Sequence, residues 1–135
     1  MYLSTERLDV ASQLITELKG VPGDLGVATD LGTVSGTLDL STYTLGAQVF
    51  RLVTGSSNLT LNVTGMPKVP AGYAGSFSIR IQQGATPRTL TLDINIKESY
   101  ANPPALTTTA NAVDILTFMW TGVEWVCFLS AAAIG

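Results

Sequence analysis

Two spacings of hydrophobic residues divide the chain into a short N-terminal segment and a longer body. Between residues 4 and 19, apolar residues recur every three or four positions, as on one face of an α-helix. This stripe consists of Leu8, Ala11, Leu14, Ile15 and Leu18. Gly20 and Pro22 follow it and favour the end of a helix. The pattern predicts an N-terminal helix within 1–20, serving as an anchor or an oligomerisation arm, and a glycine-rich hinge over 21–26.

Beyond the hinge the spacing changes to two, which is typical of β-strands with one buried face. Apolar and polar residues alternate clearly over 59–63, 77–81 and 90–96, and turn-forming residues recur about every ten positions. Weaker candidate strands lie at 37–40, 47–54, 114–120 and 124–130, the last two joined by a hairpin turn at 121–123. This rhythm predicts an all-β sandwich or barrel of seven or eight short strands that spans 27–135.

Composition narrows the range of functions. The 135 residues are 46% hydrophobic and 13% charged, with no histidine and one cysteine. The absence of histidine excludes serine and cysteine triads and ordinary zinc sites. The net charge of −3 disfavours binding to nucleic acid or to a membrane surface. A chain with so few charges has little protection against association, so we expect copies of the chain to cover part of its surface.

Carboxylates are the remaining candidates for catalysis. Asp93 with Glu98 forms one possible pair for glycoside hydrolysis, and Asp114 with Glu124 forms another. Nothing in the sequence positions either pair, and solvated carboxylates beside Arg or Lys are the simpler interpretation. We therefore predict that the protein is not an enzyme and that it holds no metal and no cofactor.

Aromatic side chains offer a second kind of site, because their apolar faces stack on sugar rings. The candidate glycan contacts are Tyr73, Tyr100, Trp120 and Trp125. For the two tryptophans a place in the core or in a subunit contact is the favoured interpretation, and Tyr73 is the better exposed candidate. Cys127 lies among apolar residues and is predicted to be a buried, unreactive thiol.

The role of the N-terminal stripe stays open between two alternatives. Its apolar residues pack on the chain's own β-body, or they join neighbouring subunits or a larger assembly. Glu6 occupies a position where a secretory signal would carry positive charge, and no apolar run reaches the roughly 20 residues of a membrane-spanning helix. We therefore expect synthesis in the cytoplasm without a signal peptide.

The C-terminal third carries a family resemblance. Residues 110–125 read Ala-Asn-Ala-Val-Asp-Ile-Leu-Thr-Phe-Met-Trp-Thr-Gly-Val-Glu-Trp, which is similar to the closing hairpin of small virion proteins of tailed bacteriophages. Their pattern is Asp and two hydrophobic residues, an aromatic pair, a glycine turn and then Trp. Gly65-Met66-Pro67, the segment 80–84 and the strand at 90–96 are similar in order, so the resemblance covers about residues 58–130.

This resemblance implies a jelly-roll-like antiparallel β-sandwich that assembles as a homotrimer on the virion. Among such proteins, a helix directly before the sandwich favours a capsid decoration (cement) protein that binds the major capsid protein or another virion protein and stabilises the head. The alternative is a tail-fibre or tail-tip module that recognises a host surface glycan. Under the first interpretation the stripe at Leu8, Ala11, Leu14, Ile15 and Leu18 contacts the shell or other copies.

Overall fold

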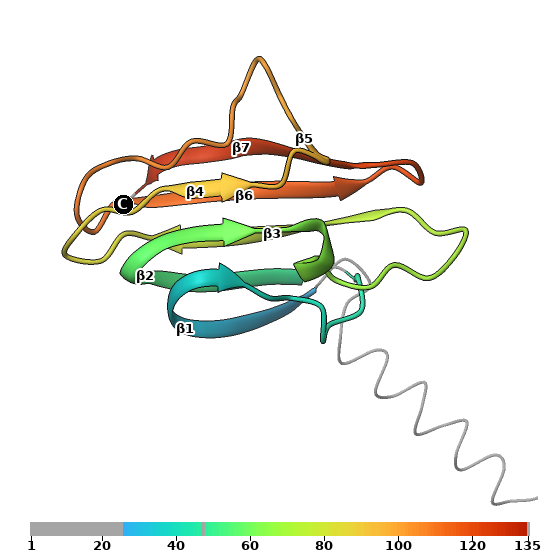
Figure 1. The fold of residues 1–135 in the computed structure, drawn as a ribbon, viewed down its shortest axis with the longest axis horizontal. Helices are drawn as coiled ribbons and strands as arrows, with labels where there is room; N and C mark the ends of the chain where they lie inside the picture. The colour runs from blue at the N-terminus through green and yellow to red at the C-terminus, as the bar shows by residue number, and fades with distance from the viewer. Residues whose placement is uncertain (1–25, 47, 135) are drawn as a thin grey trace, which may run out of the picture.

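The computed structural model describes residues 26–46 and 48–134 (Figure 1). The helix predicted within 1–20 lies outside the described residues, as do all five residues of its stripe. The hinge predicted over 21–26 lies outside them too, apart from Gly26.

Apart from one short 3-10 helix, all regular secondary structure in the described part of the chain is β-strand, which confirms the predicted all-β class. Its elements are β1 (Val27–Leu38), β2 (Gln48–Leu61), a short 3-10 helix η1 (Val63–Gly65), β3 (Gly75–Gln82), β4 (Leu90–Leu92), β5 (Ile96–Glu98), β6 (Val113–Trp120) and β7 (Trp125–Ile134). The seven strands form one sheet in the order β1-β2-β3-β6-β7-β5, with β4 paired to β2. Figure 1 shows β1 at one end of this arrangement and β7 with β5 at the other.

The first half of the sheet is parallel, which corrects the expected all-antiparallel sandwich. Val27 of β1 lies opposite Gln48 of β2, and Gln48 lies opposite Phe77 of β3, with all three strands running in the same direction. The segments that return the chain between these strands also pair, because the Leu45 amide donates to the Lys68 carbonyl at 2.7 Å. The chain therefore winds in successive turns of the same sense, and the jelly-roll topology is not confirmed.

The alternation of apolar and polar residues could not predict that these strands are parallel. Alternation with a period of two identifies the buried face of a strand but not the direction of its neighbour. Parallel neighbours need a connection long enough to bring the chain back, and the segments 39–47 and 62–74 supply it. The predicted hairpin turn at 121–123 is confirmed, since Trp120 pairs with Trp125 and joins β6 and β7 in antiparallel fashion.

The stretch at 90–96, predicted as one strand, is two short strands separated by a turn. Oδ1 of Asp93 accepts a hydrogen bond from the Asn95 amide at 3.0 Å, and Oδ2 accepts one from the Val63 amide at 3.2 Å. These bonds hold a tight turn, so that Ile94 is 87% exposed instead of continuing the buried row. β4 pairs with β2 before the turn, and β5 pairs with β7 after it. The turn thus carries the chain from a place beside β2 to a place beside β7.

The core lies on one side of the sheet, called here the inner face. Its aromatic rings make a connected series in which Phe50 contacts Phe77, Phe77 stacks on Phe118 at 5.0 Å, and Phe77 meets Trp125 edge-on at 5.7 Å. The buried residues around them are Leu38, Leu40, Leu52, Leu59, Leu61, Met66, Ile79, Ile81, Ile96, Leu116 and Cys127. Aliphatic and aromatic burial of this kind is the main source of the stability of the fold.

Candidate functional site

The strands β2, β3, β6 and β7 are called here the main sheet. The side of the main sheet that lies opposite the core, called here the outer face, is uncovered within the described residues. It carries Val49, Arg51 and Val53 of β2, Ser76, Ser78, Arg80 and Gln82 of β3, Ile115, Thr117 and Met119 of β6, and Val126, Phe128 and Ser130 of β7. All of these side chains are half-buried or exposed, with Val49 at 44% and Met119 at 43%. The outer face therefore combines aliphatic, aromatic and uncharged polar side chains with two arginines.

Hydroxyl groups on the outer face bond to one another across three strands. Ser78 Oγ lies 3.0 Å from Thr117 Oγ1, which donates to Ser130 Oγ at 3.1 Å. Ser130 Oγ in turn donates to the carbonyl of Ile115 at 2.8 Å. Because these groups already have protein partners, removing water from this part of the surface costs less than for free hydroxyls.

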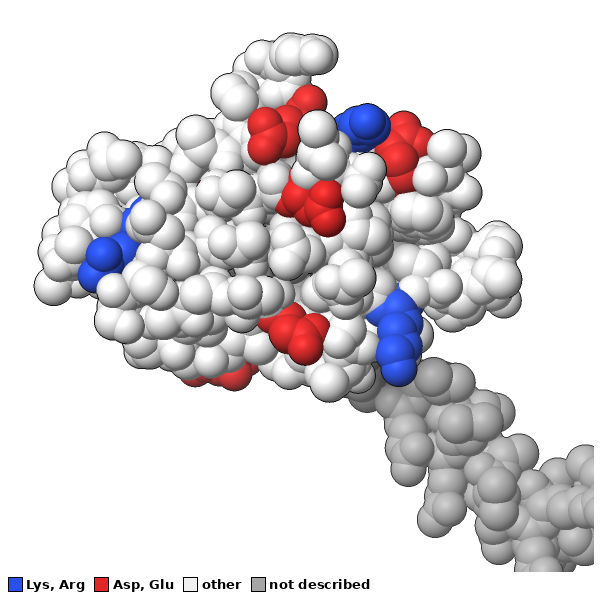
Figure 2. Space-filling view, viewed as in Figure 1, with Lys and Arg blue, Asp and Glu red and all other residues white. Residues whose placement is uncertain are grey.

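Charge on the outer face is confined to one row. Arg51 and Arg80 lie directly opposite each other on β2 and β3, and Arg51 makes a long ion pair with Asp30 at 3.7 Å. This is the only ion pair within the parts of the chain that the structure describes. Figure 2 shows that charged side chains are also few on the surface seen in that view. Most of the described surface is uncharged.

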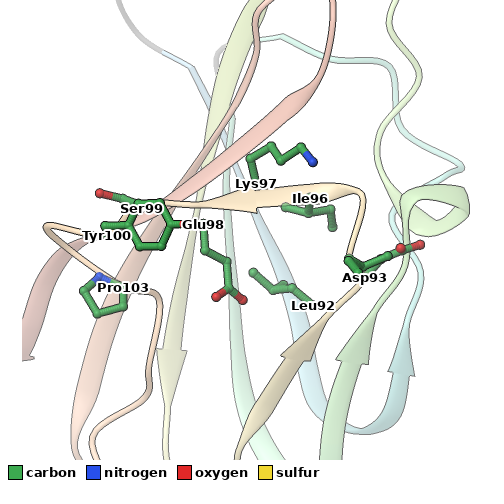
Figure 3. A pocket seen from close by; sticks show the side chains of 9 residues that line it. Leu92, Asp93, Ile96, Lys97, Glu98, Ser99, Tyr100 and Pro103 are labelled. Atoms are coloured by element: carbon green, nitrogen blue, oxygen red, sulfur yellow. The ribbon is translucent and has the colours of Figure 1, made fainter.

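A hollow beside β5, called here the Tyr100 hollow, brings together chain segments on both sides of the β4–β5 turn (Figure 3). Its volume is about 590 Å³, and its lining residues are Leu92, Asp93, Ile94, Ile96, Lys97, Glu98, Ser99, Tyr100 and Pro103. Figure 3 shows the Tyr100 ring beside Pro103 at one end, with Leu92 and the Glu98 carboxylate near the middle and Asp93 at the other end. Apolar and hydrogen-bonding groups therefore face the same space.

The loop that carries Tyr100 is held at both ends by β7. The Ser99 amide donates to the carbonyl of Cys127 at 3.0 Å, and the Leu129 amide donates to the carbonyl of Asn102 at 3.0 Å. The Asn102 amide also donates to Ser99 Oγ at 3.1 Å, which closes the loop on itself. Tyr100 stands at the tip of this short loop and is fully exposed, at 104%. Its position is therefore set by backbone hydrogen bonds and not by burial of its own ring.

Asp93 and Glu98, one of the carboxylate pairs considered for catalysis, both line the Tyr100 hollow but have different surroundings. The side-chain oxygens of Asp93 accept from the amides of Asn95 and Val63, and these hydrogen bonds lower the pKa of its carboxyl group. Asp93 is thus held as a carboxylate that shapes a turn, whereas a general acid of a glycosidase needs a raised pKa. Figure 3 shows Glu98 directed into the hollow from β5.

The second carboxylate pair is not assembled. Asp114 is buried on the inner face, where its oxygens accept from the Thr107 amide at 2.6 Å, from Thr107 Oγ1 at 2.7 Å and from the Ala133 amide at 2.9 Å. Glu124 belongs to the β6–β7 turn and bonds to Thr121 Oγ1 at 3.2 Å. Asp114 stands at the opposite end of β6 from this turn, so the two groups serve local structure.

A smaller hollow lies at the β6–β7 turn and is called here the Tyr73 hollow. Its volume is about 410 Å³, and its lining residues are Val69, Pro70, Ala71, Gly72, Tyr73, Ala74, Trp120, Thr121 and Gly122. Tyr73 is 67% exposed, and Trp120 packs against Trp125 with ring centres 5.6 Å apart. Two of the four predicted aromatic contacts thus meet in one hollow, and Tyr100 stands in the other.

Trp125 does not belong to either hollow. It is 5% exposed and lies in the core against Phe77, so its ring faces are not available to a ligand. Its alternation with Val126 on β7 places it on the inner face, in agreement with the favoured core interpretation of this residue. The sequence did not predict that the loop around Tyr100 is hydrogen-bonded to β7. This attachment depends on a strand more than 20 residues away along the chain.

Among the described residues, no group of three or more acidic or cysteine side chains is placed to hold a metal ion. Within the same residues, no helix is long and apolar enough to cross a membrane. Comparisons of the chain with protein-family models, with curated proteins and with solved structures found no match.

Proposed function

We propose that the protein is a non-enzymatic structural protein of a bacteriophage virion, most specifically a homotrimeric capsid decoration protein that stabilises the head shell. The proposal starts from the likeness of residues 110–125 to the closing hairpin of small virion proteins. The observation that carries it further is the outer face, which is broad, poor in charge and uncovered within the described residues. A surface of this kind favours association with other protein surfaces.

The chemistry of the outer face supports contact between copies. Its cross-strand hydroxyl bonds reduce the cost of desolvation, and Val49, Met119 and Phe128 supply apolar area for burial. Three copies related by a threefold axis would repeat every such contact three times, so individually weak contacts add up in a closed assembly. A shell protein gains in the same way, because many identical sites bind at once.

Light scattering on a sizing column tests the assembly, and co-sedimentation with purified heads of the parent phage tests the location. We expect a species of three times the monomer mass that binds to heads lacking the protein. Val49→Glu combined with Met119→Glu places charge on the outer face and is expected to give monomers. Thr42→Glu, an exposed position in the segment between β1 and β2, is the matched control and is expected to leave the trimer intact. A wild-type monomer that does not bind heads would refute the proposed function.

A further inference from the structure

The Tyr100 hollow combines three properties that the rest of the described surface does not bring together. First, it has apolar side chains that gain by being covered, since Tyr100 and Ile94 are 104% and 87% exposed. Second, its aromatic ring is carried by a loop that is tied to β7 at Ser99 and Asn102. Because the backbone of this loop is fixed in advance, less backbone freedom is lost when a ligand stacks on the ring.

The third property is a carboxylate without a protein partner. Within the described residues the Glu98 carboxylate takes no part in a side-chain hydrogen bond or an ion pair, and Figure 3 shows it directed into the hollow below β5. Lys97, its neighbour, leaves the opposite side of the strand (Figure 3). Asp93, at the far end, has its oxygens occupied by the Asn95 and Val63 amides. Glu98 is therefore the carboxylate of the hollow that has no protein partner.

These groups select the chemistry of the ligand. A pyranose ring has an apolar face of C–H groups, which stacks on aromatic rings, and an edge of hydroxyl groups, which donate to carboxylates. A metal cation would need several oxygen ligands converging on one point, and the described residues contain no group of three or more acidic or cysteine side chains placed to hold a metal ion. The volume of about 590 Å³ lies in the usual range for small-molecule sites.

We propose that the Tyr100 hollow binds a sugar residue of a neutral surface saccharide, which stacks on the Tyr100 ring and donates a hydroxyl hydrogen bond to Glu98. This site goes beyond the proposed role in the shell and does not depend on it. A virion protein that also holds a saccharide keeps the particle close to a glycan-covered surface, and several copies on one particle strengthen this contact.

The Tyr73 hollow has aromatic rings as well, but no carboxylate is among its lining residues. Its polar groups are the Tyr73 hydroxyl, the Trp120 indole N–H and the hydroxyl of Thr121, which bonds to the carbonyl and carboxylate of Glu124 and accepts from two turn amides. Without a carboxylate this hollow lacks the strong, charged acceptor that selects a sugar by its hydroxyl groups. Tyr73→Ala is therefore a matched control for Tyr100→Ala, since both remove an exposed tyrosine from the rim of a hollow.

Saturation-transfer and titration NMR on the full chain test the site. The probes are methyl pyranosides of glucose, galactose, mannose, rhamnose and N-acetylglucosamine. We expect at least one to bind in the millimolar range and Tyr100→Ala to weaken it by about tenfold, which corresponds to the loss of a stacking contact. Glu98→Gln is expected to weaken binding by a smaller factor, Tyr100→Phe to retain it, and Tyr73→Ala to leave it unchanged.

Three results would overturn the site. They are the absence of binding by every probe, loss of binding in Tyr73→Ala instead of Tyr100→Ala, and displacement of the sugar by tetramethylammonium at equal concentration, which would indicate a cation site. Trimer mass and head binding of Tyr100→Ala, measured in parallel, are expected to equal those of the wild type. They separate failure of the saccharide site from failure of the proposed role in the shell.

Discussion

The two faces of the main sheet are built from alternate residues of the same strands, yet different interactions satisfy them. On the inner face, stacked and edge-on rings of Phe77, Phe118 and Trp125 pack without contact with water. On the outer face, the hydroxyls of Ser78, Thr117 and Ser130 bond to one another and remain within reach of solvent. A step of one residue along β6, from Phe118 to Thr117, passes from one environment to the other.

This difference separates the determinants of folding from those of association. Burial of apolar area on the inner face supplies most of the stability, so changes there are expected to unfold the protein. Mutations on the outer face are expected to change the free energy of unfolding of one chain only slightly. The outer face instead decides what the folded chain binds. Pairs of residues taken from the two faces test this separation.

The largest difference is expected between Phe118→Ala and Thr117→Ala. Phe118 is fully buried and stacks on Phe77, so its removal leaves a cavity and is expected to cost about 4 kcal/mol of unfolding free energy. Thr117→Ala removes two partly exposed hydroxyl bonds and is expected to cost about 0.5 kcal/mol. Urea unfolding followed by circular dichroism measures both values. Losses of similar size in the two variants would show that the faces share the work of stabilisation.

A polar position on the inner face provides a second comparison. Asp114 accepts three hydrogen bonds inside the protein, so Asp114→Asn turns an amide toward groups that donate and is expected to cost about 2 kcal/mol. The outer counterpart is Asp30→Asn, which alters an exposed ion pair with Arg51 and is expected to cost less than about 0.5 kcal/mol. The same urea titrations compare the two. If Asp114→Asn were as mild as Asp30→Asn, the buried hydrogen bonds would not hold the ends of β6 and β7 together.

The sequence predicted which face of a strand is buried more readily than it predicted which strands are neighbours. The alternation at Phe77, Ile79 and Ile81 identified a buried row that the structure confirms. Pairing directions escaped it, because a strand's own residues carry no record of which way its neighbour runs. The break at Asp93 was also missed, since Leu90 to Ile96 alternates without interruption and the turn depends on hydrogen bonds to Asn95 and Val63.

The candidate sites show the same limit. Aromatic residue type was enough to single out Tyr73 and Tyr100, and the general preference of tryptophan for cores and subunit contacts was enough to favour a buried Trp125, which is 5% exposed. The Tyr100 hollow itself was not predictable, because it exists only where the parallel pairing of β5 with β7 brings the 99–103 loop beside the β4–β5 turn. Contacts between distant segments decide a site of this kind, and the local pattern does not contain them.

The smallest expected effect concerns Cys127, the inner-face position of β7 that titrates. Burial raises the pKa of its thiol to about 12, with a further contribution from the negative charge of Glu98, whereas an ordinary thiol has a pKa of 9.0. The native state therefore keeps a proton that the unfolded chain releases, so this thiol's contribution to stability is full below pH 9 and declines as the pH rises from there toward 12. Between about pH 8 and pH 10 the wild type is expected to lose about 1 kcal/mol more than Cys127→Ala. Urea titrations at the two pH values measure this difference.

The outer face of β7 supplies the control, since Ser130→Ala changes no ionisable group and is expected to follow the wild-type pH profile. A pH dependence that persists in Cys127→Ala would show that groups other than this buried thiol govern stability in alkali.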